Sequence, residues 1–164
     1  MNRTSEQRTM LRVASPSFLD GDQLPDRYAT ERAGGRNESP GVEWGSVPEG
    51  TQSIAIAMID RHPVAHDFVH WIVVNLPANT KWIGEGDSGR LPAGSRELRG
   101  TNGEVGYHGP TPPPGSGPHP YELRVWALDT IDPPLPTQPS WRDIEAALEP
   151  HALASGSLTG YSGR

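Results

Sequence analysis

The stretch Gly106–Tyr121 reads GYHGPTPPPGSGPHPY, and it decides most of what the sequence predicts about the fold. More than half of its residues are glycine or proline, and it closes a longer segment of that kind, roughly residues 77–120. So long a segment without a regular pattern is uncommon inside a compact domain and is often functional. The prolines favour a stiff loop. The other interpretation, a flexible linker between two domains, leaves too little chain on each side to bury a core.

Three apolar runs flank this loop and predict the strands of a buried sheet. Each run is short for a helix and rich in β-branched, aromatic or other large apolar residues. In the third run, alternate residues from Tyr121 to Ala127 share one face because a strand has a two-residue period. The three runs are Ser53–Asp60 (SIAIAMID), Val69–Leu76 (VHWIVVNL) and Tyr121–Leu128 (YELRVWAL).

One helix is predicted near the C-terminus. Ser140 is suited to cap it, and Asp143 holds the capping-box position, where Glu or Gln is more usual. Pro150 ends the helix, and residues 151–160 are interpreted as a last strand. An apolar stripe at helical spacing would pack on the core. The stripe consists of Trp141, Ile144, Ala147 and Leu148.

The N-terminal part of the chain is predicted to add short strands and loops. We expect strands within Met10–Phe18 and Val42–Trp44, with residues 19–41 forming a loop between them. Residues 1–10 are interpreted as a flexible tail and residues 11–164 as a single domain, because 164 residues suit one domain. The expected fold class is therefore mostly β with few helices.

Composition argues against several classes of function. The chain carries a formal charge of −6 with a pI of about 5.4, and its arginines are scattered, which argues against nucleic-acid binding. It has no cysteine, which excludes disulfides, thiolate zinc sites and a cysteine nucleophile. No apolar stretch reaches the roughly 18 residues of a membrane span. Because Met1–Met10 lacks the apolar core of a signal peptide, we expect a cytoplasmic location.

Four polar residues near strand ends are candidates for one shared site. His70 lies inside an apolar strand, where a buried imidazole needs a hydrogen-bond partner, and Asp60 at the end of the neighbouring strand could supply it. His119 and Tyr121 stand two residues apart in extended chain, so they point to the same side. A structural histidine without a ligand remains the alternative for His70.

This set of one carboxylate, two imidazoles and one phenol is compatible with three kinds of chemistry. It could bind an anion through its donors, hold a metal, or support acid–base catalysis. His62, His66 and His70 have the spacing of metal ligands on a helix, but Pro63 argues against a helix there. No Gly-x-Ser-x-Gly elbow or phosphate-binding P-loop is present, and Gly115-Ser116-Gly117 lies in a loop.

Three blocks resemble the phosphatidylethanolamine-binding (Raf-kinase-inhibitor-like) protein family, in its bacterial and archaeal branch. Asp60–Leu76 (DRHPVAHDFVHWIVVNL) is similar to the family's strand ending in Asp-Pro-Asp-Ala-Pro, followed by a short loop and a His-Trp strand. Gly106–Tyr121 resembles the family's Gly-Tyr-Gly-Gly-Pro-x-Pro-Pro loop, followed by Gly-x-His-Arg-Tyr. Leu148–Arg164 resembles its closing helix and short tail.

The resemblance implies a β-sandwich of two sheets with a C-terminal helix. It also implies a pocket for phosphate-type anions and phospholipid head groups. His62 stands where the family has a second Asp, which removes a carboxylate, adds a residue able to carry positive charge and should favour anions. Pro120 replaces the family's Arg. The implied ligand-binding residues are Asp60, His70, His119 and Tyr121, with Gly109 and Pro110 as the loop wall and His62 beside them.

The expected function is therefore non-catalytic binding of a small anionic or phosphorylated ligand, without cofactor or resident metal. The resemblance also implies a kinase or protease as a protein partner, and a homodimer, for which loop tryptophans such as Trp82 are a modest hint. The alternative is a metal-dependent hydrolase or oxygenase that uses Asp60, His70 and His119. If Asp60 hydrogen-bonds His70 or His119 and favours its protonated form, anion affinity should rise as the pH falls from about 8 to about 6.

Overall fold

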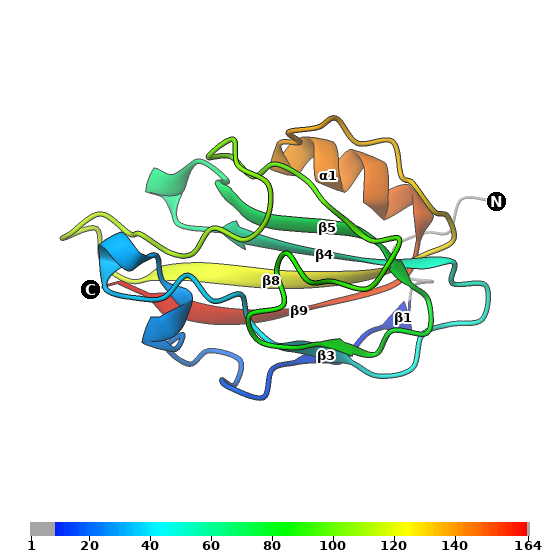
Figure 1. The fold of residues 1–164 in the computed structure, drawn as a ribbon, viewed down its shortest axis with the longest axis horizontal. Helices are drawn as coiled ribbons and strands as arrows, with labels where there is room; N and C mark the ends of the chain where they lie inside the picture. Colours follow the sequence, from blue (N-terminus) through cyan, green and yellow to red (C-terminus); the bar gives the residue numbers. More distant parts are fainter. Residues whose placement is uncertain (1–8, 164) are drawn as a thin grey trace.

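The computed structural model describes residues 9–163 and shows two β-sheets packed face to face, with one α-helix on the outer side of the larger sheet (Figure 1). The larger sheet has six strands, in the order β1 (Thr9–Met10), β9 (Ala152–Ser162), β8 (His119–Leu128), β4 (Ser53–Asp60), β5 (Val69–Pro77) and β7 (Arg96–Glu97). The smaller sheet has three, in the order β2 (Val13–Ala14), β3 (Val42–Trp44) and β6 (Trp82–Ile83). The helix is α1 (Trp141–Leu148). The fold class predicted from the sequence is confirmed.

Four short 3-10 helices complete the described part of the chain. Two of them lie in the N-terminal loop and one follows β4, while the last joins α1 to β9. They are η2 (Asp26–Tyr28), η3 (Glu31–Ala33), η4 (Pro63–Ala65) and η5 (Glu149–His151).

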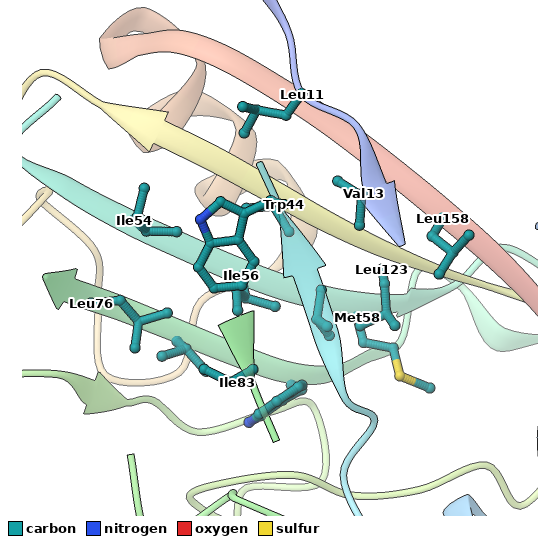
Figure 2. Close-up of a cluster of buried hydrophobic side chains, with 14 of the residues drawn as sticks. Leu11, Val13, Trp44, Ile54, Ile56, Met58, Leu76, Ile83, Leu123 and Leu158 are labelled. Carbon is teal, nitrogen blue, oxygen red and sulfur yellow. The ribbon is translucent and has the colours of Figure 1, made fainter. Parts of the chain in front are cut away.

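β4 lies between β8 and β5 in the larger sheet, and all of its residues are buried. Ile54, Ile56 and Met58 pack toward the smaller sheet, where Trp44 of β3 meets them (Figure 2). The alternate residues pack on the opposite side, against α1; they are Ala55, Ala57 and Ile59. A strand that is buried on both faces needs apolar residues throughout, which explains the uninterrupted run in the sequence.

α1 closes the second core, on the other face of the larger sheet. Its predicted stripe is buried there and packs with Trp126 of β8. The predicted capping box is present: the Ser140 hydroxyl accepts from the Asp143 N–H at 3.1 Å, and the Asp143 carboxylate accepts from the Ser140 N–H at 3.0 Å. The helix is confirmed, and Pro150 lies in η5 directly after it.

The segment Met10–Phe18 contains a strand, β2, as predicted, but the chain here is divided between the two sheets. Thr9–Met10 pairs in parallel with β9, while Val13–Ala14 pairs with β3 in the smaller sheet. The chain crosses between the sheets at Leu11, whose carbonyl lies 2.0 Å from where a Cβ on Gly156 would be. A glycine in β9 therefore permits the crossing. Most of the predicted flexible tail, residues 1–8, lies outside the described residues.

The other predicted elements are present with small shifts. β3 and β4 have the predicted bounds, β8 begins two residues earlier at His119, and β9 extends to Ser162. The loops contain the short elements η2, η3, β6 and β7. Within residues 9–163, no helix combines the length and the apolar character needed to cross a membrane.

Strand pairing brings distant residues to one end of the larger sheet. Asp60, the last residue of β4, pairs with Tyr121 of β8. Ile59 pairs with Val69, the residue before His70 in β5. The ends of three strands thus meet at the same end of the larger sheet. The Gly- and Pro-rich loop passes beside them before it enters β8.

Candidate functional site

A cavity of about 260 Å³ opens at this end of the larger sheet. Asp60, His70, His119 and Tyr121 all line it, so the structure brings together the four residues proposed from their strand positions. The remaining lining residues come from η4, from the residue before β5 and from the loop before β8. They are Val64, Ala65, Phe68, His108, Thr111, Pro112 and Pro113.

Asp60 and His119 form a buried hydrogen-bonded pair in the wall of the cavity. His119 Nδ1 lies 2.6 Å from Asp60 Oδ2, and the two side chains are 1% and 6% exposed. The other carboxylate oxygen, Oδ1, accepts the backbone N–H of His62 at 2.8 Å. Both oxygens of Asp60 therefore have donors, which offsets much of the cost of burying a carboxylate.

The His119 ring is also fixed on its other side. Its Nε2 lies 2.8 Å from the Ser116 hydroxyl, which belongs to the loop before β8. The His62 ring stacks on it with centroids 4.0 Å apart and planes at 11°. His119 is consequently held by contacts to both nitrogens and by one ring face.

His70 has a different partner from the one proposed. Its Nδ1 donates to the carbonyl of His108 at 2.7 Å, not to Asp60. Burial lowers the pKa of His70 to about 4, so the ring is neutral near neutral pH. The lowered pKa contradicts a positive charge on His70, one of the two histidines predicted to carry it; the other, His119, is the one that Asp60 contacts. With its one proton on Nδ1, His70 has an unprotonated Nε2, which is a hydrogen-bond acceptor.

Tyr121 contributes a buried hydroxyl that makes no hydrogen bond of regular geometry within residues 9–163, although the Asp60 carboxylate lies close enough to act on its pKa. The side chain is 1% exposed, and among the described residues no atom forms a hydrogen bond to its hydroxyl. Burial, followed by the charge of Asp60, raises the pKa of Tyr121 well above its usual value. The phenol therefore stays protonated. A buried hydroxyl without a partner costs stability, and such groups are often reserved for a ligand.

Gly109 and Pro110 do not line the cavity, which corrects their proposed place in its wall. The Gly109 N–H donates to Asn37 Oδ1 at 2.7 Å, and the Pro110 carbonyl accepts from the Thr30 N–H at 3.2 Å. A Cβ on Gly109 would lie 2.1 Å from the Tyr28 carbonyl. This dipeptide therefore anchors the loop to the N-terminal segment.

His62 is also outside the cavity lining. Its ring packs on His119, and its Nδ1 accepts the Val64 N–H at 3.1 Å at the start of η4. Its position supports the Asp60–His119 pair through one stacked ring and one backbone N–H. The idea that it adds positive charge to the pocket gains no support from this placement.

Several lining residues were missed by the sequence analysis. Phe68 stands two residues before His70, so strand periodicity could have placed it on the same side. Thr111, Pro112 and Pro113 lie in the quoted loop, directly after the dipeptide that was proposed. Nothing in the local sequence distinguishes which loop residues face the cavity, because the Asn37 contact that orients the loop comes from far along the chain.

The donor geometry does not favour a metal centre. Among residues 9–163, no three histidine, aspartate or glutamate side chains are placed to hold one ion together. His119 uses both ring nitrogens in hydrogen bonds, and His70 uses Nδ1.

Comparison with known proteins agrees with this fold and with the motifs that surround the cavity. The sequence model of the family described as phosphatidylethanolamine-binding protein matches residues 14–163. The chain belongs to this family. It is 33% identical over 162 residues to UPF0098 protein YbcL of Escherichia coli, covering 94% of this chain and 88% of that one. It is 35% identical over 155 residues to UPF0098 protein YbhB of the same organism, covering 91% and 98%.

A solved structure supports the same assignment. The crystal structure of E. coli YbcL, described as a member of the mammalian PEBP family, superposes with a TM-score of 0.85 at 31% identity, covering 95% of this chain and 99% of that one. Carboxypeptidase Y inhibitor, in complex with its cognate proteinase, shares the fold with a TM-score of 0.59 at 20% identity, covering 94% and 82%.

One relative bears on localisation. A Mycobacterium tuberculosis protein named as lipoprotein LppC is 32% identical over 146 residues, covering 89% of this chain and 68% of that protein. Relatives therefore include a protein named for a lipid anchor, and the cytoplasmic location of this chain stays a prediction.

Proposed function

We propose that this chain binds a small phosphorylated ligand in its singly protonated, monoanionic form. The observation that carries the proposal is the pair of groups that Tyr121 and His70 present to the cavity. One is a protonated hydroxyl without a partner, and the other is an unprotonated Nε2. The two rings meet edge to face, with centroids 5.2 Å apart.

A protonated phosphate matches both groups at once. One of its unprotonated oxygens accepts from the Tyr121 hydroxyl, and its P–O–H donates to His70 Nε2. A fully ionised phosphate offers only acceptors and leaves His70 Nε2 opposed to negative charge. The pairing of Asp60 with His119 lessens the repulsion that a free carboxylate would exert on the anion.

The rest of the cavity suits an organic group attached to the phosphate. Five lining residues supply an apolar surface beside the few polar groups of the cavity. They are Val64, Ala65, Phe68, Pro112 and Pro113. This combination is typical of small-molecule pockets, and the volume admits a compact substituent. A phosphomonoester is therefore preferred to inorganic phosphate in this proposal. No observation favours the metal-dependent hydrolase or oxygenase as a second candidate.

We also propose that the liganded protein has protein partners. Family membership suggests a kinase or a protease as the partner of the liganded protein. A homodimer is supported by Trp82, which is 65% exposed on β6, an edge strand of the smaller sheet. Sedimentation at high protein concentration tests the dimer without affecting the proposal for the pocket.

Titration calorimetry with phenyl phosphate at about pH 6 tests the ligand proposal. We expect one site per chain, and Tyr121→Phe should weaken binding by about 10- to 100-fold, as expected for a hydrogen bond to a charged group. Tyr107→Phe is the matched control. Its hydroxyl is buried but already donates to the Tyr28 carbonyl at 2.8 Å, outside the cavity lining. Equal affinity of Tyr121→Phe and the unmodified protein would refute the proposal.

A further inference from the structure

Three side chains beside the cavity form a continuous hydrogen-bonded chain that the sequence did not reveal. The Ser116 hydroxyl lies 2.8 Å from His119 Nε2, and His119 Nδ1 lies 2.6 Å from Asp60 Oδ2. A hydroxyl, an imidazole and a carboxylate in this order form the arrangement that activates serine as a nucleophile. We propose that Ser116 is such a nucleophile and accepts the acyl group of a small carboxylic ester.

The buried carboxylate decides where His119 holds its proton. The short contact to Asp60 Oδ2 requires a donor on Nδ1, and a charge-assisted hydrogen bond of this kind is stronger than one to a neutral hydroxyl. A singly protonated ring then has an unprotonated Nε2, which can accept the proton of the Ser116 hydroxyl. This is the protonation state in which an imidazole can remove a proton from serine.

Ser116 has a second acceptor within reach, the Pro113 carbonyl at 2.7 Å. A hydroxyl has only one proton, so it donates either to this carbonyl or to His119 Nε2. When it donates to Pro113, the Nε2 of singly protonated His119 lacks a donor. The two arrangements differ by rotation of one hydroxyl. The arrangement in which the hydroxyl donates to His119 Nε2 places the proton where the reaction needs it.

The surroundings hold the imidazole and the carboxylate in place. Asp60 Oδ1 accepts the His62 N–H at 2.8 Å, which orients the carboxylate. The His62 ring stacks on His119, which fixes the plane of the imidazole. Both members of the pair are almost completely buried, so water competes little for their hydrogen bond. A positioned base with an oriented carboxylate is the requirement for this class of nucleophile.

The acyl transfer balances with groups that are present. Ser116 Oγ forms a bond to the ester carbonyl carbon as its proton passes to His119 Nε2, and Asp60 stabilises the imidazolium. The bond to the alkoxy oxygen then breaks, and His119 returns the proton to the departing alcohol. The unpartnered Tyr121 hydroxyl is available to donate to the carbonyl oxygen as negative charge develops there. Ser116 bonds the carbonyl of Pro113, which lines the cavity, so the acyl group would lie at that side of the cavity.

The chain contains a matched serine that lacks the histidine. Ser95 ends the turn Pro92–Ser95 as Ser116 ends the turn Pro113–Ser116, and both turns read Pro-x-Gly-Ser. In each turn the serine N–H donates to the proline carbonyl at 3.2 Å, and the serine hydroxyl donates to the same carbonyl. Both serines are partly exposed. They differ in that Ser116 has an imidazole at its hydroxyl, whereas no histidine bonds to Ser95 among the described contacts.

A fluorophosphonate probe distinguishes these two serines in the same protein molecule. Attack by Ser116 Oγ forms a P–O bond, releases fluoride and transfers the serine proton to His119. Peptide mass spectrometry over time should show labelling of Ser116 at least about 100-fold faster than labelling of Ser95. Ser116→Ala should abolish the fast phase, and Ser95→Ala should leave it unchanged. Labelling of Ser116 at the rate of Ser95 would overturn the proposal.

A second readout separates activation from simple exposure. Asp60→Asn should slow the labelling of Ser116 at least about 100-fold while the slow labelling of Ser95 persists, because the imidazole loses its charged partner. If this variant does not fold, the comparison of the two serines in the unmodified protein decides alone. The inference does not rest on anion binding. Ser116→Ala should still bind phenyl phosphate, so the failure of either proposal is recognisable by itself.

Discussion

Asp60 and His119 are 59 positions apart in the sequence, yet their side chains meet at 2.6 Å in a buried hydrogen bond. The contact follows from antiparallel pairing, since Asp60 ends β4 opposite Tyr121 and His119 starts β8 on the same face as Tyr121. The sheet therefore delivers the carboxylate and the imidazole to the same point. The geometry of the cavity depends on this pair, and its removal should be costly.

Asp60→Asn should lower the free energy of unfolding by roughly 1–3 kcal/mol, because the new amide can accept only one of the two N–H groups that Asp60 holds and leaves the other without an acceptor. The matched control is Asp129→Asn. Asp129 also bonds a histidine, His151, at 2.9 Å, but these side chains are 46% and 40% exposed. The control should lose less than about 1 kcal/mol. Urea denaturation of both variants provides the comparison, and equal losses would show that burial of the Asp60 pair is unimportant.

His70 should make stability depend on pH in a defined window. Its pKa is lowered from 6.5 to about 4 by burial, so the unfolded chain takes up a proton that the folded protein does not. The stability that neutral His70 contributes to the folded state is fully present above about pH 6.5. It is lost as the pH falls toward about 4, and the total loss is about 3 kcal/mol.

The variant His70→Asn isolates this effect, since an amide can donate to the His108 carbonyl but does not titrate. Denaturation curves collected at several pH values between about 7 and 4 should show the unmodified protein losing more stability than the variant. Parallel pH profiles for the two proteins would mean that His70 is protonated as easily in the folded state as in the unfolded one.

Gly109→Ala tests the anchor that orients the loop. The new Cβ would lie 2.1 Å from the Tyr28 carbonyl, so backbone must move, and we expect a loss of roughly 1–3 kcal/mol or more. Gly45→Ala is the control, because nothing lies within 4 Å of a Cβ there. It should change stability by less than about 0.5 kcal/mol. Thermal unfolding of the pair is sufficient, and a neutral Gly109→Ala would indicate that the loop is loosely held.

Much of the fold could be predicted because local patterns and tertiary packing agree. Residues 54–59 are apolar on both faces of the strand, and β4 is covered on both faces. Ser140 and Asp143 form the predicted capping box. The split of Met10–Phe18 was missed because it depends on Gly156, whose lack of a side chain lets the Leu11 carbonyl pass.

The candidate site was predicted in outline, but its hydrogen bonds were not. Strand ends placed Asp60, His70, His119 and Tyr121 together, whereas the partner of His70 is a backbone carbonyl 38 positions away. Every residue has a backbone carbonyl, so the sequence does not indicate which one accepts the hydrogen bond. Ser116 was set aside because the search was for a nucleophile elbow after a strand, and its turn before β8 has a different form.

The pH dependence of ligand binding should keep its predicted direction but for another reason. Because His70 is neutral, the proton between it and the ligand must come from the phosphate, whose second pKa is about 6. Affinity for phenyl phosphate should therefore fall at least about tenfold between about pH 6 and 8, as measured by calorimetry. Phenyl sulfate does not titrate in this range. Its affinity should therefore change much less between these pH values than that of phenyl phosphate, which makes it the control.

The most direct test compares phenyl phosphate with phenyl sulfate at about pH 5, where about nine-tenths of the phosphate is monoanionic because its second pKa is about 6. The phosphate monoanion and the sulfate have the same charge and nearly the same shape, and they differ in one proton. Titration calorimetry should show phenyl phosphate binding at least about tenfold more tightly, because only its P–O–H can donate to His70 Nε2. Equal affinities, or tighter binding of the sulfate, would contradict the account.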